Sequence, residues 1–225
     1  RLMVIPGVSA WPDGRSASWP AIQSAFSRAK ATASGRRRAE GAVALDPKFA
    51  QAWAELAEAH VGMFSSSLDT TPARLAKARA ALDRARALAP DSPVVLRAIG
   101  VYHMLADLDG AKAIEQFERI LAVQPNDVDC LVKLGVAQRL IGRWPDAIRT
   151  ARTRMKLEPG NPVHARELVG LLWAVRRYDE VRAELAQLKG DSDEKEQWQA
   201  RLTFRTTGSR AALDDFDNDV FGRMQ

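Results

Sequence analysis

The sequence has a single cysteine, Cys130, in 225 residues, and it has no long apolar run. One cysteine cannot form an internal disulfide, so a disulfide-stabilised fold is excluded, and the cysteine content does not point to an oxidising compartment. No stretch approaches the ~18 consecutive apolar residues that a membrane-spanning helix needs. We therefore predict a protein that does not insert into a membrane, and we expect a cytoplasmic location.

The sequence also lacks the motifs that mark most enzyme active sites. Its three histidines, His60, His103 and His164, do not have the spacing of a zinc site, and there is no glycine-rich phosphate loop or serine-centred elbow. The acidic stretch 214–219 has the alternation of a calcium-binding loop, but Val220 stands where that loop requires glycine. We predict no catalytic residues, no metal site and no cofactor.

Positive charge exceeds negative charge only slightly. The chain contains 33 Lys and Arg residues against 28 Asp and Glu residues, for a net charge of +5, and this excess is spread along its whole length. A composition of 46% hydrophobic and 27% charged residues is typical of a globular protein. The charge pattern indicates a solvated surface, and we predict no nucleic-acid binding.

Four similar phrases, "VALDP", "RALAP", "LAVQP" and "MKLEP", recur along the chain. They end at Pro47, Pro90, Pro125 and Pro159, at spacings of 43, 35 and 34 residues. Proline cannot continue a helix, and it disfavours helical angles in the residue before it. Since helical periodicity flanks every one of these prolines, each phrase is predicted to end a helix. The sequence therefore predicts tandem helical hairpins.

The helices between these prolines share a pattern of small and apolar residues. "WAELAEAH" (53–60), "LRAIGVYH" (96–103) and "LVKLGVAQ" (131–138) each carry a leucine or isoleucine followed by a small residue. The following helices repeat a small residue, an apolar residue and the final proline, as in Ala113, Phe117 and Pro125, although Arg154 stands where the third of these helices should be small. These residues resemble the tetratricopeptide repeat family.

The resemblance implies an all-α fold, a right-handed superhelix of about five helical hairpins with a C-terminal capping segment. We assign 1–15 to a linker or the end of a preceding segment, 16–193 to the repeat array and 194–225 to capping helices. Because the chain begins with Arg1 and not with methionine, we expect it to be part of a longer protein. The spacing of 43 residues is predicted to reflect about nine extra residues within 62–71, either a tolerated surface insertion or a projecting binding loop.

In this family the first helix of each hairpin lines a concave groove, and fixed offsets from the small residue identify the groove positions. The offsets select nine residues, three in each of three helices: Arg97, Val101, Met104, Val132, Val136, Arg139, Arg166, Gly170 and Trp173. Apolar side chains with three arginines suit a peptide that carries acidic groups. The alternative is that the arginines are only solvated.

The resemblance implies a protein–protein interaction module, and the partner is predicted to be a protein or peptide. The phrasing of the repeats is similar to that of C-terminal arrays in bacterial nucleotide cyclases and winged-helix regulators. Two alternatives therefore stay open: the array regulates an attached enzyme such as a nucleotide cyclase, or it forms a homo-oligomer by self-association.

Overall fold

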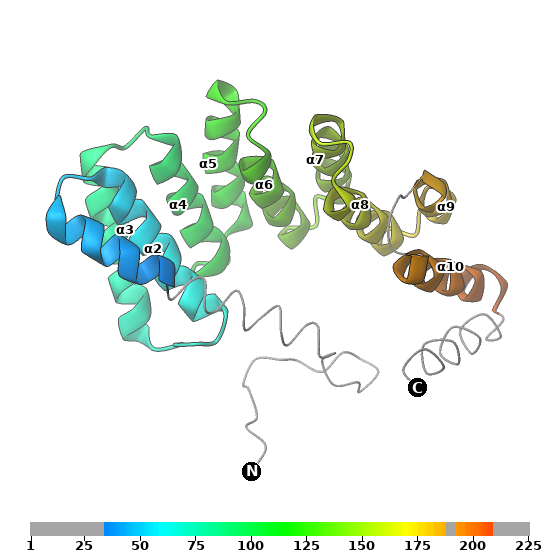
Figure 1. The fold of residues 1–225 in the computed structure, drawn as a ribbon, viewed down its shortest axis with the longest axis horizontal. Coiled ribbons are helices and arrows are strands. Elements are labelled where there is room, and N and C mark those ends of the chain that lie inside the picture. Colours follow the sequence, from blue (N-terminus) through cyan, green and yellow to red (C-terminus); the bar gives the residue numbers. More distant parts are fainter. Residues whose placement is uncertain (1–33, 188–191, 209–225) are drawn as a thin grey trace, which may run out of the picture. The chain divides into compact units, whose positions relative to one another are not determined.

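The computed structural model describes residues 34–187 and 192–208 (Figure 1). These ranges contain helices joined by short turns and no strand, so the prediction of an all-α fold is confirmed. A helical segment at 34–45 is followed by α2 (Ala50–Ser65), α3 (Pro72–Leu88), α4 (Pro93–Leu105), α5 (Gly110–Val123), α6 (Val128–Leu140), α7 (Trp144–Leu157), α8 (Pro162–Ala174), α9 (Tyr178–Gln187) and α10 (Ser192–Thr207). The predicted linker at 1–15, the acidic stretch 214–219 and a second capping helix at 209–222 lie outside the described residues.

The four repeated prolines stop the helices at one fixed place. Segment 34–45, α3, α5 and α7 each end two residues before their proline, as the sequence predicts. After Pro125 and Pro159 the next helix begins with a polar cap. Asp127 accepts a hydrogen bond from the backbone N–H of Cys130, and Asn161 accepts one from that of Val163. Such caps satisfy backbone N–H groups that have no partner inside the helix.

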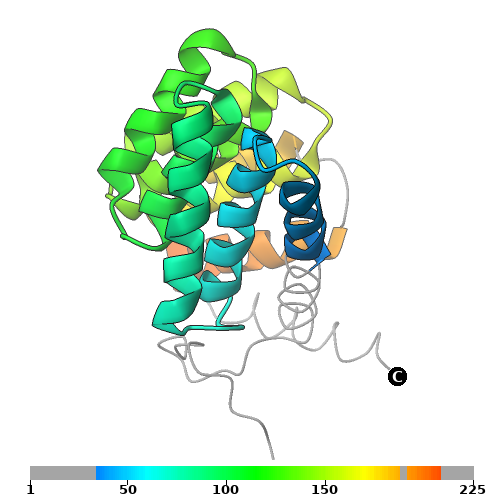
Figure 2. The same ribbon diagram turned by 90° about the vertical axis from the view of Figure 1, so that its left-hand side faces the viewer.

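The helices form two compact units, divided between Ile141 and Gly142. In the first unit, α2 packs on α3 and α4, α4 packs on α5, and α5 packs on α6. Segment 34–45 lies beside α2, with Ala39 buried in the same core (Figure 2). Alanines and Gly100 let the helices approach closely, because a Cβ atom at Gly100 would lie 2.5 Å from a ring carbon of Phe117.

In the second unit, α8 packs on α7 and α9, and α10 packs on α9. Leu168, Leu172 and Val181 are fully buried in its core. Arg154, which interrupts the repeat pattern, is only 1% exposed. Its Nη2 atom forms an ion pair with Oε2 of Glu167 on α8 at 2.7 Å, without the alignment of a hydrogen bond, and its Nε atom has no hydrogen-bond partner. The pair explains how an arginine is accommodated at a small-residue position.

We call α2 and α3 the first hairpin, because they are the first hairpin whose two helices the structure describes, and its inserted residues do not form a long loop. They are divided between the helices and the turn: α2 has 16 residues and α3 has 17, against 13 and 14 for α4 and α5, and the turn 66–71 is short. Asp69 stabilises the turn, because its Oδ2 atom accepts hydrogen bonds from the side chain of Arg74 at 2.6 and 2.9 Å. Hydrogen bonds from Thr71 and Arg74 lower the pKa of Asp69 to about 2.

Candidate partner-binding groove

The nine predicted groove residues lie on three helices, and their exposure differs from helix to helix. On α4, Val101 and Met104 are 7% and 6% exposed and belong to the core, so they offer little surface to a partner. Of the three predicted residues on this helix Arg97 is the accessible one, and its Nε atom donates a hydrogen bond of 2.9 Å to Oε1 of Glu58 on α2. The exposed surface of α4 at these positions is therefore an ion pair.

The electrostatic surroundings of Arg97 are acidic. Burial by itself would lower the pKa of Arg97, but the Glu58 carboxylate and, more weakly, Asp127 and Asp129 raise that pKa above its ordinary value. The guanidinium is therefore held in its charged form by carboxylates of α2 and of the start of α6. A ligand carboxylate would have to compete with Glu58 for this arginine.

The positions on α6 are more open. Val132 and Val136 are half-buried, and Val136 packs against the core of the first unit. Arg139, one turn further on, is exposed. Since α4 and α6 are in contact, these residues and the Arg97–Glu58 pair belong to neighbouring helices of one unit. They combine a small apolar surface with one accessible positive charge.

On α8, in the second unit, the helix surface at Gly170 is unfilled and lies beside an aromatic cluster, and we call this part of the surface the notch. No atom lies within 4 Å of the place where a Cβ atom of Gly170 would be. Trp173 is half-buried, and its ring meets those of Tyr178 and Trp198 edge-on at centroid distances of 5.3 and 5.6 Å. Arg166 is exposed on the same helix. This notch is an open apolar step with a rigid aromatic wall and a nearby cation.

Sequence reasoning missed Glu58, although the offsets used for the later helices also reach it. One residue past the small Ala57 of α2 is Glu58, which lines a hollow of about 280 Å³ with Gly35, Glu55 and Ala59. Extending the pattern to the first hairpin would therefore have found the carboxylate that pairs with Arg97. The first unit therefore presents a carboxylate beside the predicted cation Arg97.

The histidines and the cysteine serve packing and hydrogen bonding in this fold. His60 is 4% exposed, and its Nδ1 atom lies 2.8 Å from Nη1 of Arg74. His164 is equally buried, with Nε2 at 2.8 Å from Oε2 of Glu158. Burial raises the pKa of the Cys130 thiol to about 12, so this thiol is unreactive at neutral pH. Within 34–187 and 192–208, no three His, Cys, Asp or Glu side chains gather as ligands for a metal ion.

No family model and no curated protein sequence matches the chain, but solved structures match its fold. PilW, a widely conserved type IV pilus biogenesis factor, is 15% identical, with a TM-score of 0.66 over 90% of this chain and 94% of its own. The structure from a functional characterization of Pseudomonas aeruginosa PilF is 17% identical, with a TM-score of 0.59 over 88% and 91%. A MamA structure is 17% identical, with a TM-score of 0.51 over 74% and 83%.

At these identities the likeness establishes the fold alone, which is all-α and of the tetratricopeptide type. None of the three structures is described as a nucleotide cyclase or a winged-helix regulator, so that narrower resemblance stays a prediction. The cytoplasmic location is likewise a prediction. Among the described helices, none has the length and apolar character that crossing a membrane requires.

Proposed function

We propose that this protein is a protein–protein interaction module that binds a peptide segment of its partner through the predicted groove positions on α8. The notch on α8 is the observation that carries the proposal. Trp173 stands beside the open space at Gly170, and its ring is fixed by contacts with Tyr178 and Trp198. A rigid aromatic wall with an empty step beside it suits an apolar anchor residue of a partner.

The charge on the same helix favours a partner segment that also carries a carboxylate. Arg166 lies about one turn before Gly170 on α8 and is exposed. Guanidinium groups bind carboxylates through charge-assisted hydrogen bonds, often two at once. The helix that carries these residues packs on α7 and α9 of its own unit, so the repeat side needs little ordering on binding. The proposed ligand is a peptide with an apolar anchor and neighbouring acidic residues.

Filling the notch tests this proposal. Gly170→Gln places a side chain in the open step, and Gly41→Gln is the matched control, because Gly41 is also helical with no atom within 4 Å of its Cβ position. Both variants and the unmodified chain serve as baits in the lysate of the source organism, with captured proteins quantified by mass spectrometry. We expect a partner that is retained by the control and reduced at least threefold by Gly170→Gln. Equal capture by all three baits would contradict binding at the notch.

A further inference from the structure

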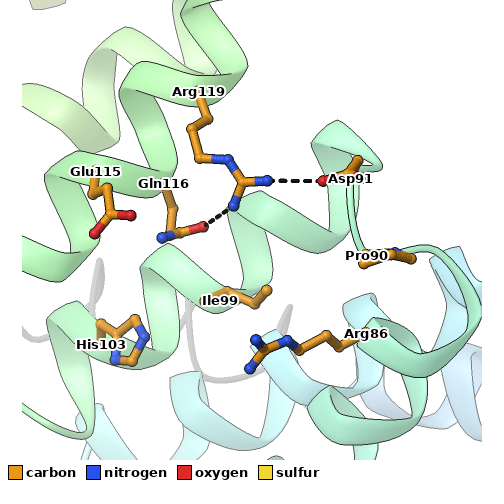
Figure 3. A pocket seen from close by; sticks show the side chains of 8 residues that line it. All are labelled: Arg86, Pro90, Asp91, Ile99, His103, Glu115, Gln116 and Arg119. Atoms are coloured by element: carbon orange, nitrogen blue, oxygen red, sulfur yellow. Dashed lines mark hydrogen bonds and ion pairs between the residues drawn. The ribbon is translucent and has the colours of Figure 1, made fainter.

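A polar cleft lies in the first unit, on the side of α4 that faces away from the predicted groove positions. It is a cleft of about 340 Å³ formed by the C-terminal end of α3, by α4 and by α5 (Figure 3). Ile99 of α4 lines the cleft and is two residues from Arg97 and two from Val101. Two residues correspond to about 200° around a helix, so Ile99 points away from the groove positions. The cleft and the groove therefore share no residue.

Arg119 of α5 is fixed at the edge of this cleft by two acceptors. Its Nη1 atom donates to Oε1 of Gln116 at 3.0 Å, and its Nη2 atom donates to Oδ1 of Asp91 at 2.8 Å. Gln116 is only 9% exposed, so the amide that orients the guanidinium is a buried part of the cleft. The Asp91 side chain is 84% exposed. The inner contact is thus fixed, while the outer carboxylate is a surface partner that contributes little and can exchange.

A second guanidinium faces the same space. Arg86, in the last turn of α3, lines the cleft from the side of Ile99 opposite to Arg119 (Figure 3). Within the described ranges Arg86 has no hydrogen bond or ion pair. At the other end of the cleft stands Glu115, whose negative charge disfavours a ligand with several anionic groups. The site therefore offers two cations around an apolar floor and room for one anionic group.

We propose that this cleft binds a carboxylate of a partner protein, and that Asp91 is its internal substitute. The ligand carboxylate replaces Asp91 at Nη2 of Arg119 and is shared with Arg86, while the aliphatic carbons of the ligand side chain cover Ile99. Two guanidinium groups can hold one carboxylate through several charge-assisted hydrogen bonds. A volume of about 340 Å³ accommodates one or two residues of a peptide. This proposal does not depend on the groove.

Removing the internal substitute gives a test in which the variant gains affinity. The probe is acetyl-Leu-Asp-Leu-amide, titrated into the 15N-labelled chain and followed through the amide shifts of α4 and α5. We expect Asp91→Asn to lower the Kd at least threefold, because the competing carboxylate is gone. Asp179→Asn is the matched control, since Asp179 is a similarly exposed aspartate paired with an arginine, Arg182, in the other unit. This control should leave the Kd unchanged.

Loss of either cation should have the opposite effect. Arg86→Gln or Arg119→Gln is expected to raise the Kd at least fivefold, whereas Arg84→Gln, which removes the same charge from the other side of α3, should not. The proposal is overturned if the probe with Asn in place of Asp binds equally well, or if Asp91→Asn and Asp179→Asn have the same effect. It is also overturned if inorganic phosphate at equal concentration shifts the same amides more than the peptide does. If the cleft does not bind a carboxylate, the proposed binding at the notch on α8 is not affected, because the two sites lie in different units.

Discussion

Gly100 and Gly170 both lie inside helices, but their surroundings place opposite demands on them. A Cβ atom at Gly100 would lie 2.5 and 2.8 Å from ring carbons of Phe117, which is itself fully buried and cannot retreat. The space at Gly170 is open. The same chemical change, one added methyl group, therefore meets a rigid core in one unit and solvent in the other.

We predict that Gly100→Ala lowers the free energy of unfolding by about 1–2 kcal/mol, because overpacking outweighs the ~1 kcal/mol by which a helix prefers alanine. Gly170→Ala should raise it by about 0.5–1 kcal/mol, since only the helix preference changes there. Urea denaturation of the two variants measures both values. Shifts of the two midpoints in the same direction would contradict the close approach of α4 and α5.

Residue identities in the repeat pattern were predictable, but the partners of the exceptional residues were not. The sequence shows that Arg154 occupies a position where the repeat pattern expects a small residue. Only the structure shows that it forms an ion pair with Glu167 of the next helix. In the same way, the offsets select Val101 and Met104 for the groove, and the structure places both in the core. Periodicity gives the face of a helix, whereas the depth of burial depends on neighbouring helices that are distant in the sequence.

At the scale of elements, helix ends were predicted better than helix lengths. The prolines determine where α3, α5 and α7 stop, because the ring excludes helical geometry just before it. The sequence predicts extra residues within 62–71, either as a surface insertion or as a projecting loop. In the structure 62–65 belong to α2 and 66–71 form a turn, and α2 and α3 are each three residues longer than α4 and α5. The hydrogen bonds that join Asp69, Arg74 and His60 could not be predicted from the sequence.

The contact between His60 and Arg74 makes the stability of the first hairpin sensitive to acid. Burial and then the Arg74 guanidinium lower the pKa of His60 below its ordinary value of 6.5. Between pH 6.5 and the lower pKa of the folded state, the unfolded chain binds a proton that the folded chain does not. Stability from this residue is therefore present above pH 6.5 and is lost as the pH falls through the folded-state pKa. We predict that the free energy of unfolding decreases as the pH falls below 6.5.

The control for this pH dependence is His60→Gln, whose amide oxygen can still accept a hydrogen bond from Arg74 but does not titrate. Its unfolding free energy should change less over the same pH range, because every other titratable group is common to the two proteins. Thermal or urea denaturation in matched buffers at several pH values gives the comparison. Parallel pH profiles for the two proteins would rule out His60 as the source.

At the scale of the whole molecule, the described helices have two separate cores, one on each side of the boundary between Ile141 and Gly142. In stacked repeats each element is stabilised mainly by its immediate neighbours. We predict that Gly100→Ala speeds amide hydrogen exchange in α4 and α5 much more than in α8 and α9. Hydrogen exchange read by mass spectrometry measures this difference. A uniform increase across all helices would show that the chain unfolds as one cooperative unit.

Because helices end at equivalent prolines, whole repeats can be added to the chain or removed from it during evolution. Residues 91–125 begin directly after Pro90 and end with Pro125, so this cassette starts and finishes at equivalent points of the same turn. Duplicating it or removing it would leave every remaining helix with its own beginning and end. Genetic gain or loss of whole cassettes is therefore tolerated far better than insertion of a few residues inside a helix. A lineage could in this way lengthen or shorten the array without redesigning any single helix.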